Sequence, residues 1–239
     1  HGNQTYLEVV ENSCNPGFVN LGLKLGKEKL FEYIRKFGYG SKTGIDLLGE
    51  STGIIFNENK IDNVELATAS FGQGNAVTAI QLVNAASAAV NGGILHKPYV
   101  LSKIMNEEEV LVENNPTIIR RVISEETSSI VKYALESVAS LGTARGAYID
   151  GYRIGGKTGT AEKLPRGNGK YLVSFIGYAP QDNPQIAIAV AVENAGFGST
   201  WACPIATLLI EQYLTGEIKR NWLYDRMVNA NLIDKADEQ

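Results

Sequence analysis

Gly155-Gly156-Lys157-Thr158-Gly159-Thr160 is the stretch of this 239-residue sequence that says most about its fold. It lies in the first of three apolar or β-prone segments, near residues 152–162, 171–178 and 185–193. Short links rich in Gly, Asn, Asp and Pro join these segments and have turn chemistry. Links of this length cannot hold a crossover, so neighbouring strands must run antiparallel. The sequence therefore predicts a three-stranded antiparallel sheet.

The residue types in this stretch suit the recognition of an anion. Lys157 supplies a positive charge, and Thr158 and Thr160 supply hydroxyls beside Gly159, where a second backbone can approach closely. Fixed donors of this kind bind a carboxylate and stabilise an oxyanion that forms during acyl transfer. The alternative interpretation is an exposed lysine followed by a glycine at a β-bulge.

A second triplet, Ser13-Cys14-Asn15, offers a hydroxyl and a carboxamide two residues apart. Pro16 follows and suits the first position of a helix, with Asn15 as its N-cap. In a serine acyl-transfer site, Ser13 would relay a proton and Asn15 would hold the base and a substrate amide. Alternatively, the triplet is only a helix start.

Apolar residues at helical spacing predict helices before and after the sheet. The helix that begins at Ser124, with Glu125 and Glu126 near its positive end, is expected to bury Ile130, Ala134, Leu135 and Val138. The predicted fold class is α/β in the α+β sense, with an antiparallel sheet and helices before and after it along the chain. The predicted ranges are roughly 1–140 for the helical part, called the helical lobe below, 150–195 for the strands, 203–215 for the last helix and 217–239 for a polar tail.

Bulk composition excludes several classes of function. The formal net charge is −4, from 22 basic and 26 acidic residues, so neither a nucleic-acid groove nor a polybasic membrane patch is indicated. No apolar run reaches the roughly 18 residues that a membrane span needs. Function is therefore expected to reside in a site.

The two cysteines, Cys14 and Cys203, are interpreted as buried thiols. One alternative adds His1 and makes a Cys/His metal site, for which zinc is the metal expected from the ligand types. A disulfide between Cys14 and Cys203 is the other alternative.

Taken together, the two triplets and their flanking sequence resemble the penicillin-binding proteins, in particular the class B transpeptidase domain and its sporulation-specific branch. The likeness covers most of the chain to about Leu214. It is carried by Lys157-Thr158-Gly159 and by His1-Gly2, Ser13-Cys14-Asn15-Pro16-Gly17-Phe18, Phe37-Gly38, Thr43-Gly44-Ile45-Asp46-Leu47, Phe71-Gly72-Gln73-Gly74, Val90-Asn91-Gly92-Gly93 and Ser174-Phe175-Ile176-Gly177-Tyr178-Ala179-Pro180.

The resemblance implies a D,D-transpeptidase that cross-links peptidoglycan stem peptides, is acylated by β-lactams and requires no cofactor. It implies the C-terminal portion of a penicilloyl-serine transferase, or β-lactamase-like, fold with a cleft between the sheet and the helical lobe. It also implies a place at the extracytoplasmic face of the cell membrane, through an anchor absent from this chain.

Individual roles follow from the same resemblance. Ser13 and Asn15 would act as proton relay and amide clamp, and Lys157 and Thr158 would bind the substrate carboxylate. Thr160 would donate to the oxyanion. Gly156 and Gly159 would complete the substrate-binding strand.

The family's nucleophile, a serine three residues before a lysine, precedes the Ser-x-Asn triplet. The string Ser129-Ile130-Val131-Lys132 stands in the wrong order, and its helix is expected to leave Ser129 and Lys132 in solvent. Lys42-Thr43-Gly44 is likewise interpreted as a decoy, because no strand pattern precedes it. We therefore expect the nucleophile on an N-terminal segment missing from this chain, within the same protein or as a separate chain.

Two other functions stay open at this stage. A relative with a different reaction would be a carboxypeptidase, a β-lactamase or a β-lactam sensor. A non-catalytic wall-binding module would keep the cleft without the nucleophile.

Overall fold

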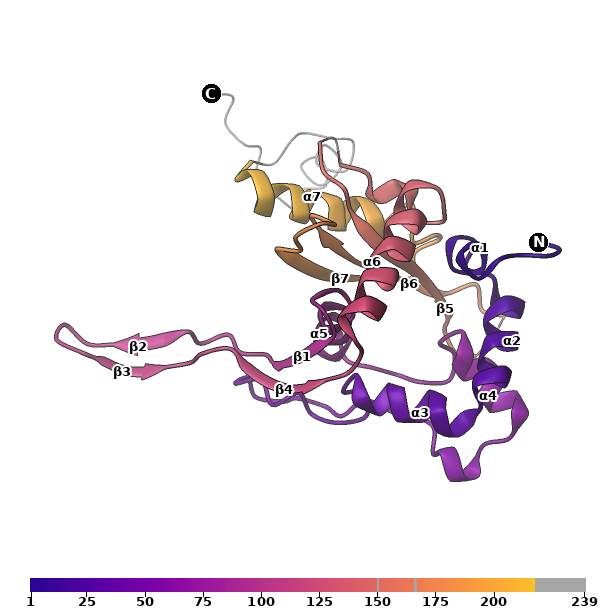
Figure 1. The fold of residues 1–239 in the computed structure, drawn as a ribbon, viewed down its shortest axis with the longest axis horizontal. Helices are drawn as coiled ribbons and strands as arrows, with labels where there is room; N and C mark the ends of the chain where they lie inside the picture. Colours follow the sequence, from indigo (N-terminus) through magenta and orange to yellow (C-terminus); the bar gives the residue numbers. More distant parts are fainter. Residues whose placement is uncertain (150, 166, 218–239) are drawn as a thin grey trace.

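The computed structural model describes residues 1–149, 151–165 and 167–217. Its longer helices and its strands alternate irregularly along the chain (Figure 1). The helices are α1 (Tyr6–Glu11), α2 (Asn15–Leu25), α3 (Lys27–Lys36), α4 (Asn63–Ser70), α5 (Ala79–Val90), α6 (Glu125–Ser140) and α7 (Ala202–Thr215), with 3-10 turns at Glu58–Lys60 and Arg145–Ala147. The strands are β1 (Ile94–Lys97), β2 (Lys103–Met105), β3 (Val110–Glu113), β4 (Thr117–Arg121), β5 (Gly155–Glu162), β6 (Tyr171–Ala179) and β7 (Ile186–Glu193).

The predicted C-terminal sheet is confirmed. Strands β5, β6 and β7 pair in that order and antiparallel, with Lys157 opposite Ile176 in the register of the first pair. Strand β5 begins three residues later than expected, at Gly155, and Tyr152 belongs instead to an isolated bridge with Ile149. Strand β5 is one of the two edge strands of this sheet within the described residues, so its free edge is available to line a cleft.

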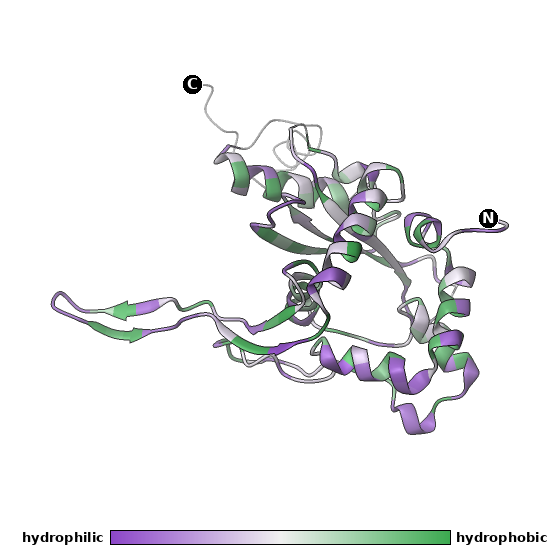
Figure 2. Ribbon diagram, viewed as in Figure 1, coloured by the Kyte–Doolittle hydropathy of each residue, from purple (hydrophilic) through white to green (hydrophobic). Residues whose placement is uncertain are grey.

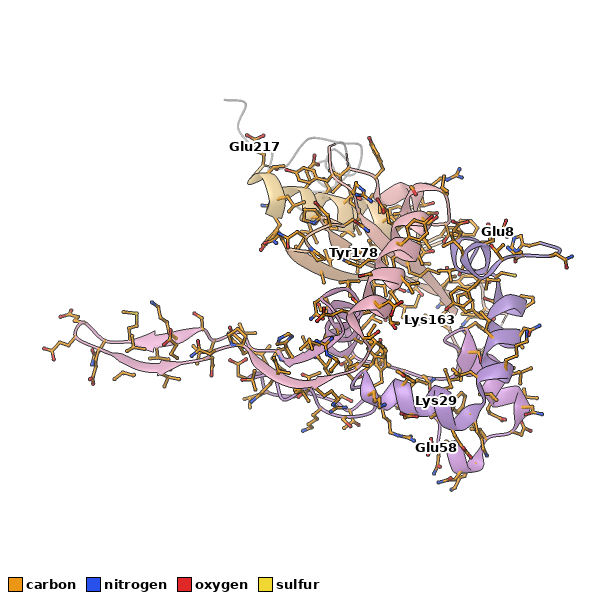
Figure 3. All side chains as sticks on the ribbon, in the orientation of Figure 1. Glu8, Lys29, Glu58, Lys163, Tyr178 and Glu217 are labelled. Atoms are coloured by element: carbon orange, nitrogen blue, oxygen red, sulfur yellow. The ribbon has the colours of Figure 1, made fainter. Side chains whose placement is uncertain are left out.

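Helices cover both faces of this sheet (Figure 1). On one face, Phe175 of β6 packs against Cys203 and Ala206 of α7 in a fully buried cluster. On the other face, Tyr178 of β6, labelled in Figure 3, donates its hydroxyl to the carbonyl of Lys132 in α6 at 3.0 Å. Side chains on the two faces of β6 thus pack against two different layers of helices.

The ring of Phe175 lies across two glycines on neighbouring strands. A Cβ on Gly156 would stand 2.3 Å from this ring, and one on Gly177 would stand 2.4 Å from it. Both distances are far below van der Waals contact, so the ring occupies the space that side chains would need.

We expect Gly156→Ala to lower the free energy of unfolding by about 1–3 kcal/mol, because it overfills a packed core. Gly196→Ala is the matched control, since a Cβ there meets nothing within 4 Å and no positive φ opposes it. Urea unfolding of both variants measures the difference. Equal stability of the two variants would contradict the packing argument.

The N-terminal helices α1 and α2 pack against α6 and α4. Helix α2 packs closely on α4, where a Cβ on Gly22 would collide with Ser70. Helix α1 docks on the end of α6: the Ser137 hydroxyl donates to the Glu11 carboxylate, and the Thr143 N–H donates to the Glu11 carbonyl at 3.2 Å. These contacts fix α1 and the start of α2 relative to the sheet.

Strands β1 to β4 lie within the range predicted as the helical lobe. Strand β1 pairs with β4, and β2 pairs with β3 in a hairpin that projects far from the rest of the molecule (Figure 1). Both hairpin strands contain hydrophobic residues (Figure 2), and Ile104, Met105 and Val112 are exposed. Asp46 ties the root of the hairpin by accepting from the N–H groups of Val100 and Leu101.

The prediction for the inward face of α6 is wrong in part. The helix begins at Ser124 as predicted, with the Ser124 hydroxyl accepting from the Thr127 N–H. Val138 is buried, but Ile130 is 58% exposed. Ser128 takes the inward position instead, because its hydroxyl donates to the Ala89 carbonyl and accepts from the Gly92 N–H.

No helix within residues 1–149, 151–165 or 167–217 is long and apolar enough to cross a membrane. The predicted polar tail lies outside the described residues, apart from Glu217.

Candidate active site

A cleft of about 880 Å³ lies between the edge of β5 and the helices α2 and α4. Residues of both predicted triplets line it, so the two motifs face a shared groove. From the sequence-predicted set, the lining includes Ser13, Asn15, Lys157, Thr158, Gly159 and Thr160. The remaining lining residues are Phe18, Thr68, Ser70, Phe71, Gln73, Thr143, Glu162, Tyr171, Phe197, Gly198 and Ser199.

Lys157 joins the two walls of the cleft directly. Its ammonium Nζ donates to the hydroxyl oxygen of Ser13 at 2.7 Å and to its neighbour's carbonyl, Thr158 O, at 3.0 Å. An ammonium has three N–H donors, so one donor is left for a ligand. The two motifs, far apart in the sequence, thus form a single hydrogen-bonded unit.

The environment of Lys157 alters its proton affinity. Burial lowers the pKa of the Lys157 ammonium from 10.5 to about 8, although the nearby Cys203 thiol acts in the opposite direction. Burial likewise raises the pKa of Cys203 to about 12, against the influence of Lys157. A lysine of this kind is protonated at neutral pH, yet close enough to its pKa to exchange a proton.

The lowered pKa of Lys157 predicts opposite pH dependences for binding and stability. Carboxylate affinity should fall as the pH rises through about 8, because the folded chain then loses the positive charge. Stability should rise between pH 8 and 10.5, because the unfolded chain then binds more protons than the folded one. Titration of benzylpenicillin binding and of the melting temperature from pH 6 to 10 checks both signs, and flat profiles in Lys157→Met serve as control.

Ser13 occupies a tight turn between α1 and α2. Its backbone has φ 50°, in the left-handed region that non-glycine residues seldom adopt. The N–H groups of Ser13 and Cys14 donate back to carbonyls of α1, at 3.2 Å to Val10 and 3.0 Å to Val9. The turn thereby directs the Ser13 hydroxyl toward the strand that carries Lys157.

Asn15 does not cap a helix as predicted. It is the first residue of α2, and Cys14 takes the cap position without a side-chain hydrogen bond. The Asn15 carboxamide is exposed in the cleft and makes no hydrogen bond with the described residues. Its donor and acceptor therefore remain available to a ligand.

The two candidate glycines of β5 lie in different surroundings. Gly159 lines the cleft, and a Cβ there would stand 2.6 Å from the Ser174 hydroxyl. Gly156 is buried under Phe175 and is not among the residues lining this cleft. The structure thus gives Gly156 a packing role and does not place it with the predicted substrate-binding residues.

The cysteine prediction is confirmed, whereas the metal alternative is not supported. Cys14 and Cys203 are both free and buried, so no disulfide joins them. Within the described residues, no three His, Cys, Asp or Glu side chains gather as metal ligands do, so His1, Cys14 and Cys203 do not form the zinc site of that alternative. His1 is an exposed residue at the start of the chain.

Both decoy motifs lie outside the cleft. Ser129 is exposed and its hydroxyl donates to the Glu125 carbonyl of its own helix at 3.0 Å, while Lys132 is half-buried. In the second decoy, the N–H groups of Thr43 and Gly44 donate to the Glu50 carboxylate. This second segment is a loop, as expected.

Sequence reasoning missed Thr143, which lies in the loop after α6 and lines the cleft. Its hydroxyl accepts from the Thr158 hydroxyl at 3.1 Å. No sequence motif marks this position, because the contact joins two segments only after the sheet and α6 have packed together. The aromatic residues Phe18, Phe71, Tyr171 and Phe197 also contribute to the lining without having been singled out individually.

Comparison with known proteins agrees with this geometry. The model of the penicillin binding protein transpeptidase domain matches residues 1–211. Stage V sporulation protein D of Bacillus subtilis is 55% identical over 216 residues, which cover 86% of this chain and 33% of that protein. The penicillin-binding protein PbpB of Mycobacterium tuberculosis is 30% identical, over 84% of this chain and 32% of that protein.

Solved structures give the same result. Penicillin binding protein 3 from Mycobacterium tuberculosis, complexed with ampicillin, superposes with a TM-score of 0.80 at 27% identity, covering 91% of this chain and 53% of the other. The D,D-transpeptidase domain from Eggerthella lenta gives a TM-score of 0.80 at 26% identity, covering 90% and 55%. The chain spans about a third of the length of its first relatives. On this match of sequence, fold and cleft, the chain belongs to the penicillin-binding protein transpeptidase domain family.

Proposed function

We propose that this chain forms part of a peptidoglycan D,D-transpeptidase that cross-links stem peptides through a serine acyl-enzyme. The observation that carries the proposal is the contact between Lys157 Nζ and Ser13 Oγ, which joins a cationic strand to a hydroxyl across one cleft. Thr158, Thr160 and the Asn15 carboxamide line the same cleft.

In the proposed acyl transfer, these groups hold the substrate and move a proton. A serine oxygen attacks the carbonyl of the D-Ala–D-Ala amide, the C–N bond breaks, and the departing amine takes a proton. The amine of a second stem peptide then displaces the serine oxygen and forms the cross-link. Lys157 and Thr158 hold the terminal carboxylate of the donor peptide, while Ser13 passes the proton that Lys157 helps to control.

The tetrahedral intermediates need donors for the oxyanion and a grip on the peptide. We assign one oxyanion donor to the main chain of Thr160. Asn15 holds the substrate amide, and Gly159 lets the peptide approach the strand. Serine acyl transfer uses acid–base and hydrogen-bonding groups alone, so the proposed reaction requires no cofactor.

We place the nucleophilic serine on a segment outside the printed sequence, so this chain by itself would be inactive. The Ser-x-x-Lys string of this chain, Ser129 to Lys132, does not supply the nucleophile in the structure. Its serine is hydrogen-bonded within α6 and is not among the residues that line the cleft, which supports a nucleophile on another segment. The segment with the nucleophile would belong to the same protein, or be a second chain that completes the cleft.

Relatives extend the proposal to partners and location. Penicillin binding protein 3 of Mycobacterium tuberculosis was solved with ampicillin and with aztreonam, which supports β-lactams as ligands here. The 55% identity to a stage V sporulation protein supports a role in spore formation. We propose the extracytoplasmic face of the cell membrane as its location, through an anchor outside this chain.

Covalent labelling with a fluorescent penicillin tests the proposal. We expect the full-length protein to be labelled and the 239-residue chain alone to stay unlabelled. Labelling of the chain alone would refute the placement of the nucleophile. A full-length protein that binds penicillin without labelling would point to a non-catalytic module, and rapid release of the label would point to a β-lactamase.

A further inference from the structure

The hydroxyls of Thr143 and Thr158 form a contact that the proposed reaction does not yet use. They lie 3.1 Å apart, Thr158 is the donor, and both residues line the cleft. Thr143 is fixed from the other side, because its N–H donates to the Glu11 carbonyl, two residues before Ser13. Thr143 therefore touches both segments that carry the proposed machinery.

The Thr158 hydroxyl has a single proton, and this limits which hydrogen bonds Thr158 can make at the same time. A threonine hydroxyl has one proton, and the Thr158 proton is directed at Thr143. A carboxylate only accepts hydrogen bonds, so Thr158 has to turn its proton away from Thr143 in order to bind one. The Thr143 hydroxyl oxygen then no longer accepts a hydrogen bond from Thr158, and the Thr143 hydroxyl can donate its own proton to Thr158 instead.

We propose that Thr143 is a positioning residue for carboxylate binding, an inference that rests on the proposed function. When a carboxylate enters, the Thr143 hydroxyl rotates and donates to Thr158 Oγ, while Thr158 donates to the carboxylate. No proton leaves its oxygen: the hydrogen bond between Thr143 and Thr158 reverses its direction, and the bond from Thr158 to the carboxylate is new. A donor behind Thr158 polarises its hydroxyl and strengthens the bond to the ligand.

The local backbone supports a fixed position for Thr143. A Cβ on the preceding Gly142 would stand 2.5 Å from the Glu11 carbonyl, so the loop passes as close to the end of α1 as glycine allows. Helix α1 is held in turn by the hydrogen bond from Ser137 to the Glu11 carboxylate. The Thr143 oxygen is thus placed by main-chain contacts that its own hydroxyl does not determine.

The test compares the binding of benzylpenicillin and of its methyl ester to the 239-residue chain by calorimetry. The ratio of the two affinities measures the contribution of the free carboxylate to binding, because the ester lacks it. We expect Thr143→Val to lower this ratio by about 3- to 10-fold, the usual worth of one hydrogen bond. Thr143→Ser should keep the ratio, because it retains the hydroxyl.

A double-mutant cycle separates positioning from mere packing. If Thr143 acts through Thr158, then Thr143→Val combined with Thr158→Val should lower the ratio no further than Thr158→Val alone. Thr207→Val is the matched control, since the Thr207 hydroxyl bonds the Cys203 carbonyl in α7, outside the cleft. It should leave the ratio unchanged.

Two results would overturn the inference. One is a Thr143→Val variant that loses affinity equally for acid and ester, and the other is additivity in the cycle. Either could occur while the full-length protein is still labelled by penicillin, so the proposed function would survive. An unaltered chain that binds acid and ester equally would instead refute the carboxylate site itself, and the inference with it.

Discussion

Replacement of Lys157 by alanine is expected to lower the rate of acylation of the full-length protein by about two to four orders of magnitude. In the proposed mechanism the ammonium supplies the charge that holds the carboxylate, and in the structure it donates to the Ser13 hydroxyl at 2.7 Å. Its loss removes both interactions at once. The rate of fluorescent labelling by penicillin, measured against penicillin concentration, gives the effect.

Lys163→Ala is the matched control for the loss of one lysine charge close to β5 in the sequence. Lys163 follows β5 directly and forms an ion pair with Glu193 at 2.7 Å, and neither residue is among those that line the cleft. Figure 3 labels Lys163 on the ribbon. Lys157→Met, which keeps most of the side-chain volume, distinguishes loss of charge from loss of packing. Near-normal acylation of Lys157→Ala and Lys157→Met would refute the role of Lys157.

Loss of the Ser13 hydroxyl is expected to have an effect of similar size, about two to four orders of magnitude on acylation. Two variants are needed, because Ser13 has φ 50°. Ser13→Ala removes the hydroxyl and keeps a side chain in a strained backbone. Ser13→Gly also removes the hydroxyl, but glycine adopts a positive φ without strain.

The comparison of these variants locates the cause. If the hydroxyl relays the proton, both variants should lose acylation to the same extent, and Ser13→Gly should unfold at the same or a higher temperature than Ser13→Ala. A fully active Ser13→Gly would show that the hydroxyl is dispensable. Labelling kinetics and thermal unfolding of the same preparations provide both readings.

Local patterns predicted those parts of the fold whose cause is local. The turn residues between the last three strands predicted their antiparallel order, and Ser124 with two following glutamates predicted the start of α6. Proximity of the two triplets was also predicted, but it rested on a resemblance and not on spacing. Their contact through Lys157 and Ser13 appears only when the strand and the turn are placed in space.

Other features depend on packing that no local pattern records. Ile130 fits the helical periodicity yet is exposed, because Ser128 fastens α6 to the end of α5 by two hydrogen bonds. The sequence pattern placed Gly156 on a substrate-binding strand, but the residue is glycine because the Phe175 ring occupies the space that a side chain would need. Thr143 carries no sequence signal at all.

The sequence by itself determined the chemistry of this protein: a lysine, hydroxyls and a carboxamide in two motifs, and an antiparallel sheet to carry one of them. Covalent structure dictates residue types, turn conformations and strand alternation, and these act over a few residues. Tertiary structure alone decided which groups meet, because burial and long-range hydrogen bonds arise only between packed elements. It buried Lys157 against Ser13, which lowers the pKa of the lysine, and it set Thr143 behind Thr158.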